Sequence, residues 1–149
     1  MAVRIREARP GEEQGLLALY EGLFEPPGTR PASWDPALAA RALAGAIEGD
    51  RSTVLVAEEG EDAVGLCTAY LDLHSVRYGL RCWVEDLVVE TGSRSRGAGG
   101  ALLDSAAEWA RERGATHLEL DTALARSDAQ RFYEHRNPAI VGYSYSWPL

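Results

Sequence analysis

The sequence predicts an α/β fold, and three patterns along its 149 residues support this. A strand-like run, Trp83 to Val89, leads through a glycine-rich loop into a helical pattern, Gly99 to Arg113, which an alternating run, Thr116 to Asp121, follows. This is the order of a βαβ unit with a right-handed crossover. Upstream, the runs 52–57 and 64–73 flank a polar turn, as the two strands of a β-hairpin do.

The N-terminal elements follow from local signals. Val3 to Ala8 alternates apolar and charged residues, which is typical of an outer strand. Apolar residues at helical spacing then predict a first helix, which ends at Pro26-Pro27-Gly28. Asp35-Pro36 is a start signal for a second helix, and Gly49 closes it. The hairpin continues into a third strand, 80–89, whose last residues are continuously apolar, as in a strand covered on both faces.

Two elements are predicted after the βαβ unit. A short helix spans Ser127 to Arg136 and stops before Pro138, because proline cannot continue it. Ala139 to Trp147 is rich in tyrosine and is predicted as a closing strand. The complete predicted order is therefore β-α-α-β-β-β-α-β-α-β.

Composition narrows the class of protein. The length predicts a single domain over 1–149. A formal charge of −8 disfavours nucleic acid as a partner, because phosphate backbones need a basic surface. The sequence shows no signal peptide and no membrane span, so we expect a cytoplasmic protein. Cys67 and Cys82 are expected to be reduced core residues, and the histidines lack metal-ligand spacing, so no metal is expected.

The loop from Arg94 to Gly100 is the most informative segment. A loop rich in glycine and arginine that opens into a helix offers free N–H groups, positive dipole and guanidinium groups to anionic oxygens. It is not a P-loop, because the chain contains no lysine. It is not a dinucleotide fingerprint, because Leu102 stands where the third glycine would be. The remaining pattern is Arg-x-x-Gly-x-Gly, which predicts a diphosphate site.

This loop resembles the acyl-CoA pyrophosphate loop of the GNAT superfamily of N-acetyltransferases. Trp83 to Val89 and Thr116 to Asp121 resemble the fourth and fifth strands of that family, and Ala129 to Glu134 resembles its A-x-x-F-Y-E helix. The resemblance implies a GNAT fold, with a central mixed, mostly antiparallel sheet of six to seven strands flanked by helices. It also implies acetyl-CoA as the cosubstrate and a primary amine as the acceptor.

The resemblance also assigns roles to residues. The backbone of strand four would pair with the pantetheine arm, and an N–H near Val89 would stabilise the oxyanion. Tyr133 would be the general acid that protonates the leaving thiolate. The residues expected to bind the coenzyme are Leu87, Val88, Val89, Arg94, Ser95, Arg96, Gly97, Ala98, Gly99, Gly100 and Phe132.

Glu85 and Asp86 are the candidates for the base that deprotonates the amine, or for the acceptor contact. Strand alternation places their side chains on opposite faces, so we expect only one to face the acceptor cleft. The alternative is that these carboxylates form ion pairs with a neighbouring arginine, such as Arg81 or Arg126. The family asparagine before the last helix is Arg126 here, which leaves one pantetheine contact in doubt.

The leading hypothesis is an acetyl-CoA-dependent N-acetyltransferase that acts on a small cationic amine in a ternary complex. The acidic chain favours a polyamine, aminoglycoside, amino sugar or amino-acid derivative, while a protein N-terminus or lysine also fits. The alternative function is a non-catalytic acyl-CoA-binding regulatory module, which would need neither Tyr133 nor a base. The aromatic C-terminal run could pack into the core of its own chain or onto a partner. The resemblance favours a homodimer, because many relatives dimerise, often through their last strands. Asn137-Pro138 departs from the family pattern and could alter the path into that run.

Overall fold

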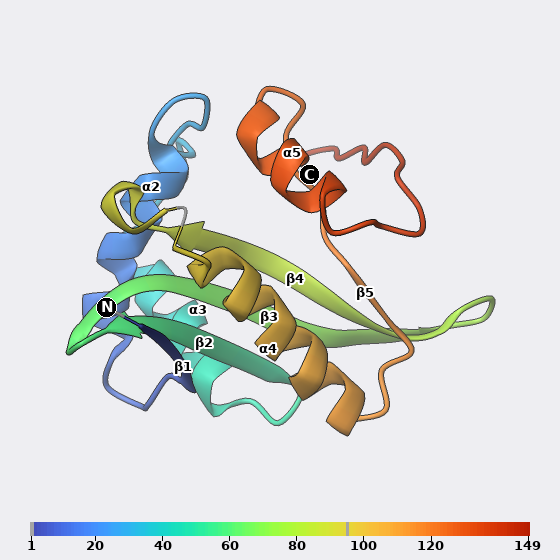
Figure 1. Cartoon of the computed structure of the whole chain (residues 1–149), viewed down its shortest axis with the longest axis horizontal. Coiled ribbons are helices and arrows are strands. Elements are labelled where there is room, and N and C mark those ends of the chain that lie inside the picture. The colour runs from blue at the N-terminus through green and yellow to red at the C-terminus, as the bar shows by residue number, and fades with distance from the viewer. Residues whose placement is uncertain (1, 95) are drawn as a thin grey trace. The chain divides into compact units, whose positions relative to one another are not determined.

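The computed structural model describes residues 2–94 and 96–149, which form two compact units, Met1–Glu119 and Leu120–Leu149. The first unit contains a mixed sheet in the order β1-β2-β3-β4-β5, antiparallel except for the parallel pair β4-β5 (Figure 1). Its strands are β1 (Val3–Glu7), β2 (Ser52–Glu59), β3 (Asp62–Ser75), β4 (Gly79–Val89) and β5 (His117–Glu119). The predicted hairpin and βαβ unit are both present.

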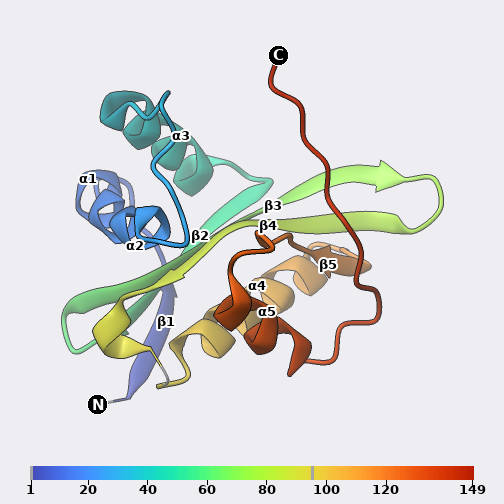
Figure 2. The same cartoon turned by 90° about the horizontal axis from the view of Figure 1, so that it is seen from above.

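Helices cover both faces of this sheet (Figure 2). One face carries the N-terminal turns α1 (Glu13–Leu16), η1 (Leu17–Tyr20) and α2 (Glu21–Phe24), together with α3 (Pro36–Glu48). The first predicted helix is thus divided into short segments. The Asp35 side chain caps α3 by accepting from the N–H of Ala37 at 2.9 Å, as its start signal predicts.

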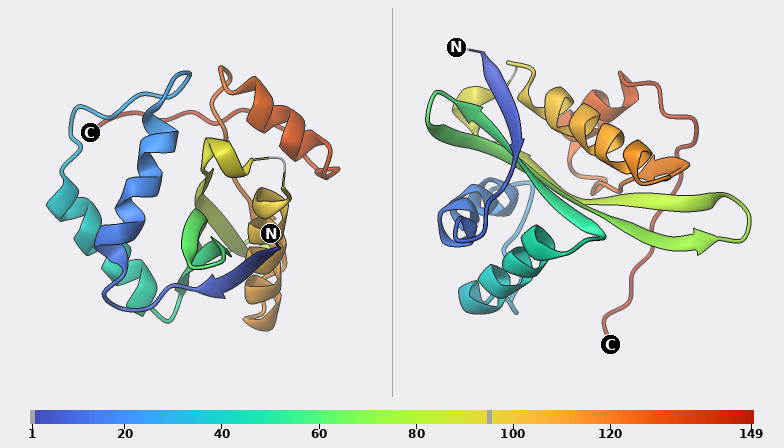
Figure 3. Two further views of the ribbon diagram at one scale, coloured as in Figure 1. Left: turned by 60° about the vertical axis from the view of Figure 1, so that its left-hand side comes forward. Right: turned by 90° about the horizontal axis from the view of Figure 1, so that it is seen from below.

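The other face carries α4 (Ala98–Glu112), and the right-hand view of Figure 3 shows it on the side of the sheet away from α3. Its apolar stripe, which includes Leu102 and Ala106, is fully buried against the strands. Beneath the N-terminal helices, a second buried cluster joins them to the sheet. Its members are Leu16, Leu19, Leu43, Val54, Val56, Leu66 and Val88.

The prediction of six to seven strands is wrong for the described residues, which form five. The run 139–147, expected to close the sheet, has no strand in the second unit. Alternation of apolar and polar residues predicts the faces of a strand, but a strand also needs a hydrogen-bonded neighbour, which this run lacks. Among its described residues, the second unit has one helix, α5 (Ser127–Glu134).

Strand β4 contains an irregularity that changes its register with β3. Thr68 lies opposite Asp86, whereas Ala69 lies opposite Val84, so Glu85 is an extra residue that forms a β-bulge. On its other edge, β4 pairs with β5 only from Arg81 to Trp83. Beyond Trp83, within the described residues, this edge of β4 has no neighbouring strand.

Among the described residues, no helix combines the length and the apolar character that a membrane crossing requires. In residues 2–94 and 96–149, no group of three or more His, Cys, Asp and Glu side chains is placed to hold a metal ion. Cys67 and Cys82 are buried and unpaired, as expected.

Candidate active site

The N-terminus of α4 presents free amide groups. Gly97 precedes the helix with a φ of +85°, a left-handed conformation that glycine adopts without strain. The first helical bond runs from the N–H of Ala101 to the carbonyl of Gly97, at 2.9 Å. The N–H groups of Ala98, Gly99 and Gly100 therefore have no acceptor within the helix. Together with the helix dipole, they favour an anionic ligand.

Two arginines flank this helix start. Arg94 donates through Nε to the carbonyl of Val89 at 3.1 Å, and Arg96 pairs with Glu59 at 2.9 Å. Both side chains are thereby tied to the sheet beside the loop, and Arg96 keeps about half of its surface exposed, at 53%. The role predicted for Ser95 concerns a residue that lies outside the described part of the chain.

The last residues of β4 offer backbone groups to the unpaired edge. The N–H of Glu90 donates to the carbonyl of Val64 at 2.8 Å, and the N–H of Asp86 donates to the side-chain hydroxyl of Thr68 at 3.1 Å, so both point toward β3. Alternation along the strand directs the N–H and C=O of Leu87 and Val89 the other way. An extended ligand could therefore pair with this edge as an added strand does.

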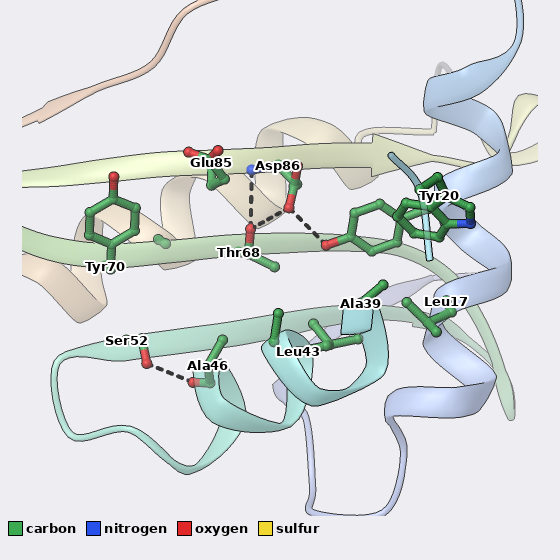
Figure 4. Close-up of a pocket in the computed structure, with 13 residues that line it drawn as sticks. Leu17, Tyr20, Ala39, Leu43, Ala46, Ser52, Thr68, Tyr70, Glu85 and Asp86 are labelled. Carbon is green, nitrogen blue, oxygen red and sulfur yellow. Dashed lines mark hydrogen bonds between the residues drawn. The ribbon is translucent and has the colours of Figure 1, made fainter. Parts of the chain in front are cut away.

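A pocket of about 300 Å³ opens between α3 and the face of β3 and β4 (Figure 4). Its wall is the side of α3 that carries mostly alanine, and its floor contains both carboxylates of the bulge. The lining residues are Leu17, Tyr20, Trp34, Ala39, Ala42, Leu43, Ala46, Ser52, Thr68, Ala69, Tyr70, Glu85 and Asp86.

The expectation that Glu85 and Asp86 face opposite ways is wrong, because both line this pocket. The physical reason is the bulge, since an extra residue interrupts the alternation of side chains along a strand. The Asp86 carboxylate accepts from the Tyr20 hydroxyl at 2.8 Å and from the Thr68 hydroxyl at 2.9 Å. The Glu85 carboxylate accepts from the Trp83 indole N–H at 2.7 Å.

The alternative that Arg81 neutralises one of these carboxylates is not what the structure shows. Arg81 instead forms ion pairs with Asp72 and Glu119. The hydrogen bond from Arg81 holds the pKa of the Asp72 carboxyl below its usual value. Neither partner of Arg81 is among the residues that line the pocket.

Tyr20 is a site residue that the sequence does not reveal. Its only local signal is its place in an apolar helical stripe, where a tyrosine is expected to pack. Burial raises the pKa of the Tyr20 phenol well above its usual value, and the neighbouring Asp86 charge raises this pKa further. Tyr20 therefore keeps its proton and remains a donor to Asp86. Burial, followed by the charge of Glu85, also raises the pKa of Tyr70.

Phe132 and Tyr133 belong to α5 of the second unit, where their rings meet edge to face with centroids 5.2 Å apart. The guanidinium of Arg136 lies 5.9 Å from the Phe132 ring centroid. The catalytic role of Tyr133 and the coenzyme contact of Phe132 remain predictions from the resemblance.

Comparison with known proteins shows which family this chain resembles. The model of the acetyltransferase (GNAT) family matches residues 15–137. The uncharacterized N-acetyltransferase YhdJ of Bacillus subtilis (strain 168) is 44% identical over 85 residues, which cover 56% of this chain and 59% of that protein. The chain thus spans less than two thirds of YhdJ. The uncharacterized N-acetyltransferase YhfO of the same organism is 31% identical over 132 residues, covering 89% of this chain and 87% of that protein.

A solved structure agrees on the fold. Aminoglycoside N-acetyltransferase AAC(6')-Iy in complex with CoA superposes with a TM-score of 0.84 at 14% identity, over 99% of this chain and 94% of that one. At this identity the likeness concerns the fold alone. The match to the family model, the relatives and the shared fold together show that the chain belongs to the GNAT family of N-acetyltransferases.

Proposed function

We propose that this protein transfers an acetyl group from acetyl-CoA to the primary amine of a small cationic acceptor, by direct attack in a ternary complex. The observation that carries the proposal is the bulged strand β4. Its unpaired edge leads toward the N-terminus of α4, while its bulge presents Glu85 and Asp86 to a pocket. One strand thus serves both a coenzyme site and an amine site.

The residues present fit acetyl-CoA. The amides of Ala98, Gly99 and Gly100, with Arg94 and Arg96 nearby, would hold the two phosphates. The backbone of Leu87 and Val89 would hydrogen-bond the pantetheine arm. When bound, the coenzyme supplies an acetyl thioester, and the Val89 N–H would stabilise negative charge on its carbonyl oxygen.

The acceptor must lose a proton before it can attack. Glu85 or Asp86 would take that proton, directly or through water, because an alkylammonium with a pKa near 10 is otherwise protonated at neutral pH. The new bond joins the amine nitrogen to the acetyl carbon, and the bond from that carbon to sulfur breaks. Tyr133 would give its proton to the departing thiolate, and the second proton, which the nitrogen loses as the amide forms, would restore the phenol directly or through water.

Direct transfer is supported by the state of the two cysteines. A covalent acetyl-enzyme would need an accessible nucleophile with a low pKa. Cys67 and Cys82 have no exposed surface, and burial raises the pKa of Cys67 to about 12 and that of Cys82 to about 11. Neither thiol is suited to accept the acetyl group.

The test is thiol release from acetyl-CoA in the presence of a panel of primary amines. Wild type should show amine-dependent release, and Tyr133→Phe should lower kcat by about 100-fold, because general acid catalysis contributes about this much. Glu85→Gln and Asp86→Asn should identify the base, because the variant that lacks it should have a low kcat/KM that no longer rises as pH is raised from the acid side. If no amine supports release while acetyl-CoA still binds, the alternative of a non-catalytic acyl-CoA-binding module is favoured.

We also propose that the protein is a homodimer. In the second unit, the C-terminal run carries large apolar side chains that are each at least 73% exposed, and such patches are typical of interfaces. They are Ile140, Val141, Tyr143, Tyr145, Trp147 and Leu149. Light scattering should give twice the chain mass of 16.2 kDa, and a monomer mass at all concentrations would contradict this proposal.

A further inference from the structure

The two sides of the pocket differ in chemistry, because the side formed by α3 is apolar and the side formed by β4 is charged. On the α3 side its lining is apolar and small, with Ala39, Ala42 and Ala46 spaced along one side of the helix around Leu43. Because alanine ends at Cβ, these positions leave the space that larger side chains would fill. The pocket owes its volume of about 300 Å³ in part to this alanine face.

Negative charge is confined to one place. Glu85 and Asp86 are adjacent in β4, and the other lining residues carry no charge at neutral pH. One carboxylate oxygen of Asp86 accepts both hydroxyl hydrogen bonds and one of Glu85 accepts from the Trp83 indole, so the second oxygen of each carboxylate can accept from a ligand cation. A second ammonium group placed against the α3 side would lie on apolar surface with no carboxylate from that helix beside it, which is unfavourable.

An aromatic wall faces this charged corner. The Trp34 ring meets Phe24 edge to face, with centroids 4.8 Å apart, and lies 6.2 Å from the Tyr20 ring. These contacts hold the indole in place before any ligand arrives. A positioned indole and an apolar helix face suit a flat apolar group, because such a group gains both burial and ring contacts.

We propose that the acceptor is a monocation: a single primary ammonium group on a short linker to an apolar, preferably aromatic, body. The ammonium lies at Glu85 and Asp86, and the apolar body packs between Trp34 and the alanine face of α3. The space between these two walls limits the size of the body. This inference rests on the proposed function and narrows its acceptor from small cationic amines in general to this class.

Turnover across a matched set of amines tests the class. With acetyl-CoA saturating, kcat/KM should be at least about tenfold higher for 2-phenylethylamine and tryptamine than for spermidine, glucosamine and kanamycin, the scale on which a pocket discriminates by burial. Higher kcat/KM for the polycations or the amino sugar would overturn the inference and leave the proposed function standing.

Pocket variants test the location. Ala42→Leu fills the pocket and should lower kcat/KM for tryptamine by at least about tenfold, by the same scale of discrimination. Ala37→Leu makes the same change on α3 at an exposed position outside the pocket lining and should leave the value at that of wild type. Equal effects of the two variants, or none from Ala42→Leu, would contradict the assignment.

Binding separates failure of this inference from failure of the proposed function. Tryptophan fluorescence of wild type should change saturably with 2-phenylethylamine. The change should be smaller in Trp34→Phe, where Trp83 beside Glu85 still reports binding, and higher concentrations should be needed in Ala42→Leu. If this pattern is found without turnover of any amine, the proposed function fails and the ligand class is supported. If spermidine binds more tightly than 2-phenylethylamine, the ligand class is wrong, whatever the turnover.

Discussion

Asp86 shows how single side chains prepare the pocket. Two hydroxyl donors, from Tyr20 and Thr68, fix its carboxylate, and each comes from a different element. Hydrogen bonds to a charged group contribute about 1.5–3 kcal/mol each when buried. The two bonds therefore orient the carboxylate toward the pocket. They also contribute moderately to the stability of the folded protein. In the proposed reaction Tyr20 would act through Asp86, as a positioning residue.

Replacing Tyr20 by phenylalanine should separate acceptor binding from coenzyme binding. Tyr20→Phe removes one donor to Asp86, so we expect the KM for the amine to rise several-fold and the pH profile of kcat/KM to shift, while the KM for acetyl-CoA is unchanged. Urea unfolding should show a loss of about 1–2 kcal/mol. Tyr78→Phe, at an exposed tyrosine, is the matched control. An unchanged amine KM and pH profile would mean that the Tyr20 hydroxyl has a structural role only.

At this scale the sequence is a partial guide. Two carboxylates in an apolar strand are unusual enough to identify Glu85 and Asp86 as candidates, and both do line the pocket. Tyr20 could not be identified in the same way, because its partner is 66 residues away in the sequence. Only the fold brings the two together.

The bulge in β4 is the element on which both proposed sites depend. Without Glu85, Val84 and Asp86 would be consecutive and would face Ala69 and Thr68 in a regular antiparallel ladder. We therefore expect deletion of Glu85 to preserve folding, because the core positions on either side keep their faces. It should also let β4 continue its pairing with β5 and so close the unpaired edge.

Calorimetry and circular dichroism check this prediction. The deletion variant should keep the wild-type spectrum and lose at least about tenfold in acetyl-CoA affinity, or 1.4 kcal/mol. Glu85→Gln keeps the bulge and should bind acetyl-CoA as wild type does. Wild-type affinity in the deletion variant would show that the bulge is not needed for the coenzyme.

The two ends of α4 offer a matched pair of glycines. Gly97 and Gly114 both have a φ of +85°, and a Cβ at either position would meet no atom within 4 Å. Alanine at either site should destabilise the protein by about 1–2 kcal/mol, because a left-handed conformation is strained for it. Only Gly97→Ala should also weaken acetyl-CoA binding, which calorimetry can measure. Equal affinities of the two variants would argue against a phosphate site at this end of the helix.

Secondary structure is predictable where the signal is local and less so where it depends on pairing. The Asp35 cap and Pro36 mark the start of α3, and the periodic apolar residues of α4 mark its buried face. The bulge has no comparable mark, because it is defined by the register with β3. The expected strand over 139–147 fails for the same reason, since alternation alone does not provide a neighbour.

At the scale of the whole molecule, one ion-pair network joins the start of the chain to the sheet. Arg6 in β1 pairs with Glu12 at 2.8 Å and with Glu58 of β2 at 3.0 Å. The hydrogen bond from Arg6 lowers the pKa of Glu12, and the hydrogen bond from Arg4 together with the nearby charge of Arg6 lowers the pKa of Glu58. Each carboxylate is thus more easily kept ionised in the folded state than in the unfolded chain.

This network predicts the pH dependence of stability. Since the folded pKa values lie below the ordinary 4.5, the contribution is present above pH 4.5 and is lost as pH falls through the folded pKa values. Thermal unfolding should therefore give a steady melting temperature near neutral pH and a decline below about pH 4.5. Arg6→Gln should lower the neutral value and flatten the decline. A variant that declines as steeply as wild type would show that other carboxylates dominate acid unfolding.

The central claim is that backbone amides of β4 and α4 bind acetyl-CoA, and amide NMR tests it most directly. Titration of the ¹⁵N-labelled protein with acetyl-CoA should shift the amides of Leu87, Val89 and Ala98 to Gly100 saturably and more than those of β1 and β2. Adding an amine should then move the signals of Glu85 and Asp86. Saturation with no shift at the α4 amides, or with the largest shifts elsewhere in the sheet, would contradict the account.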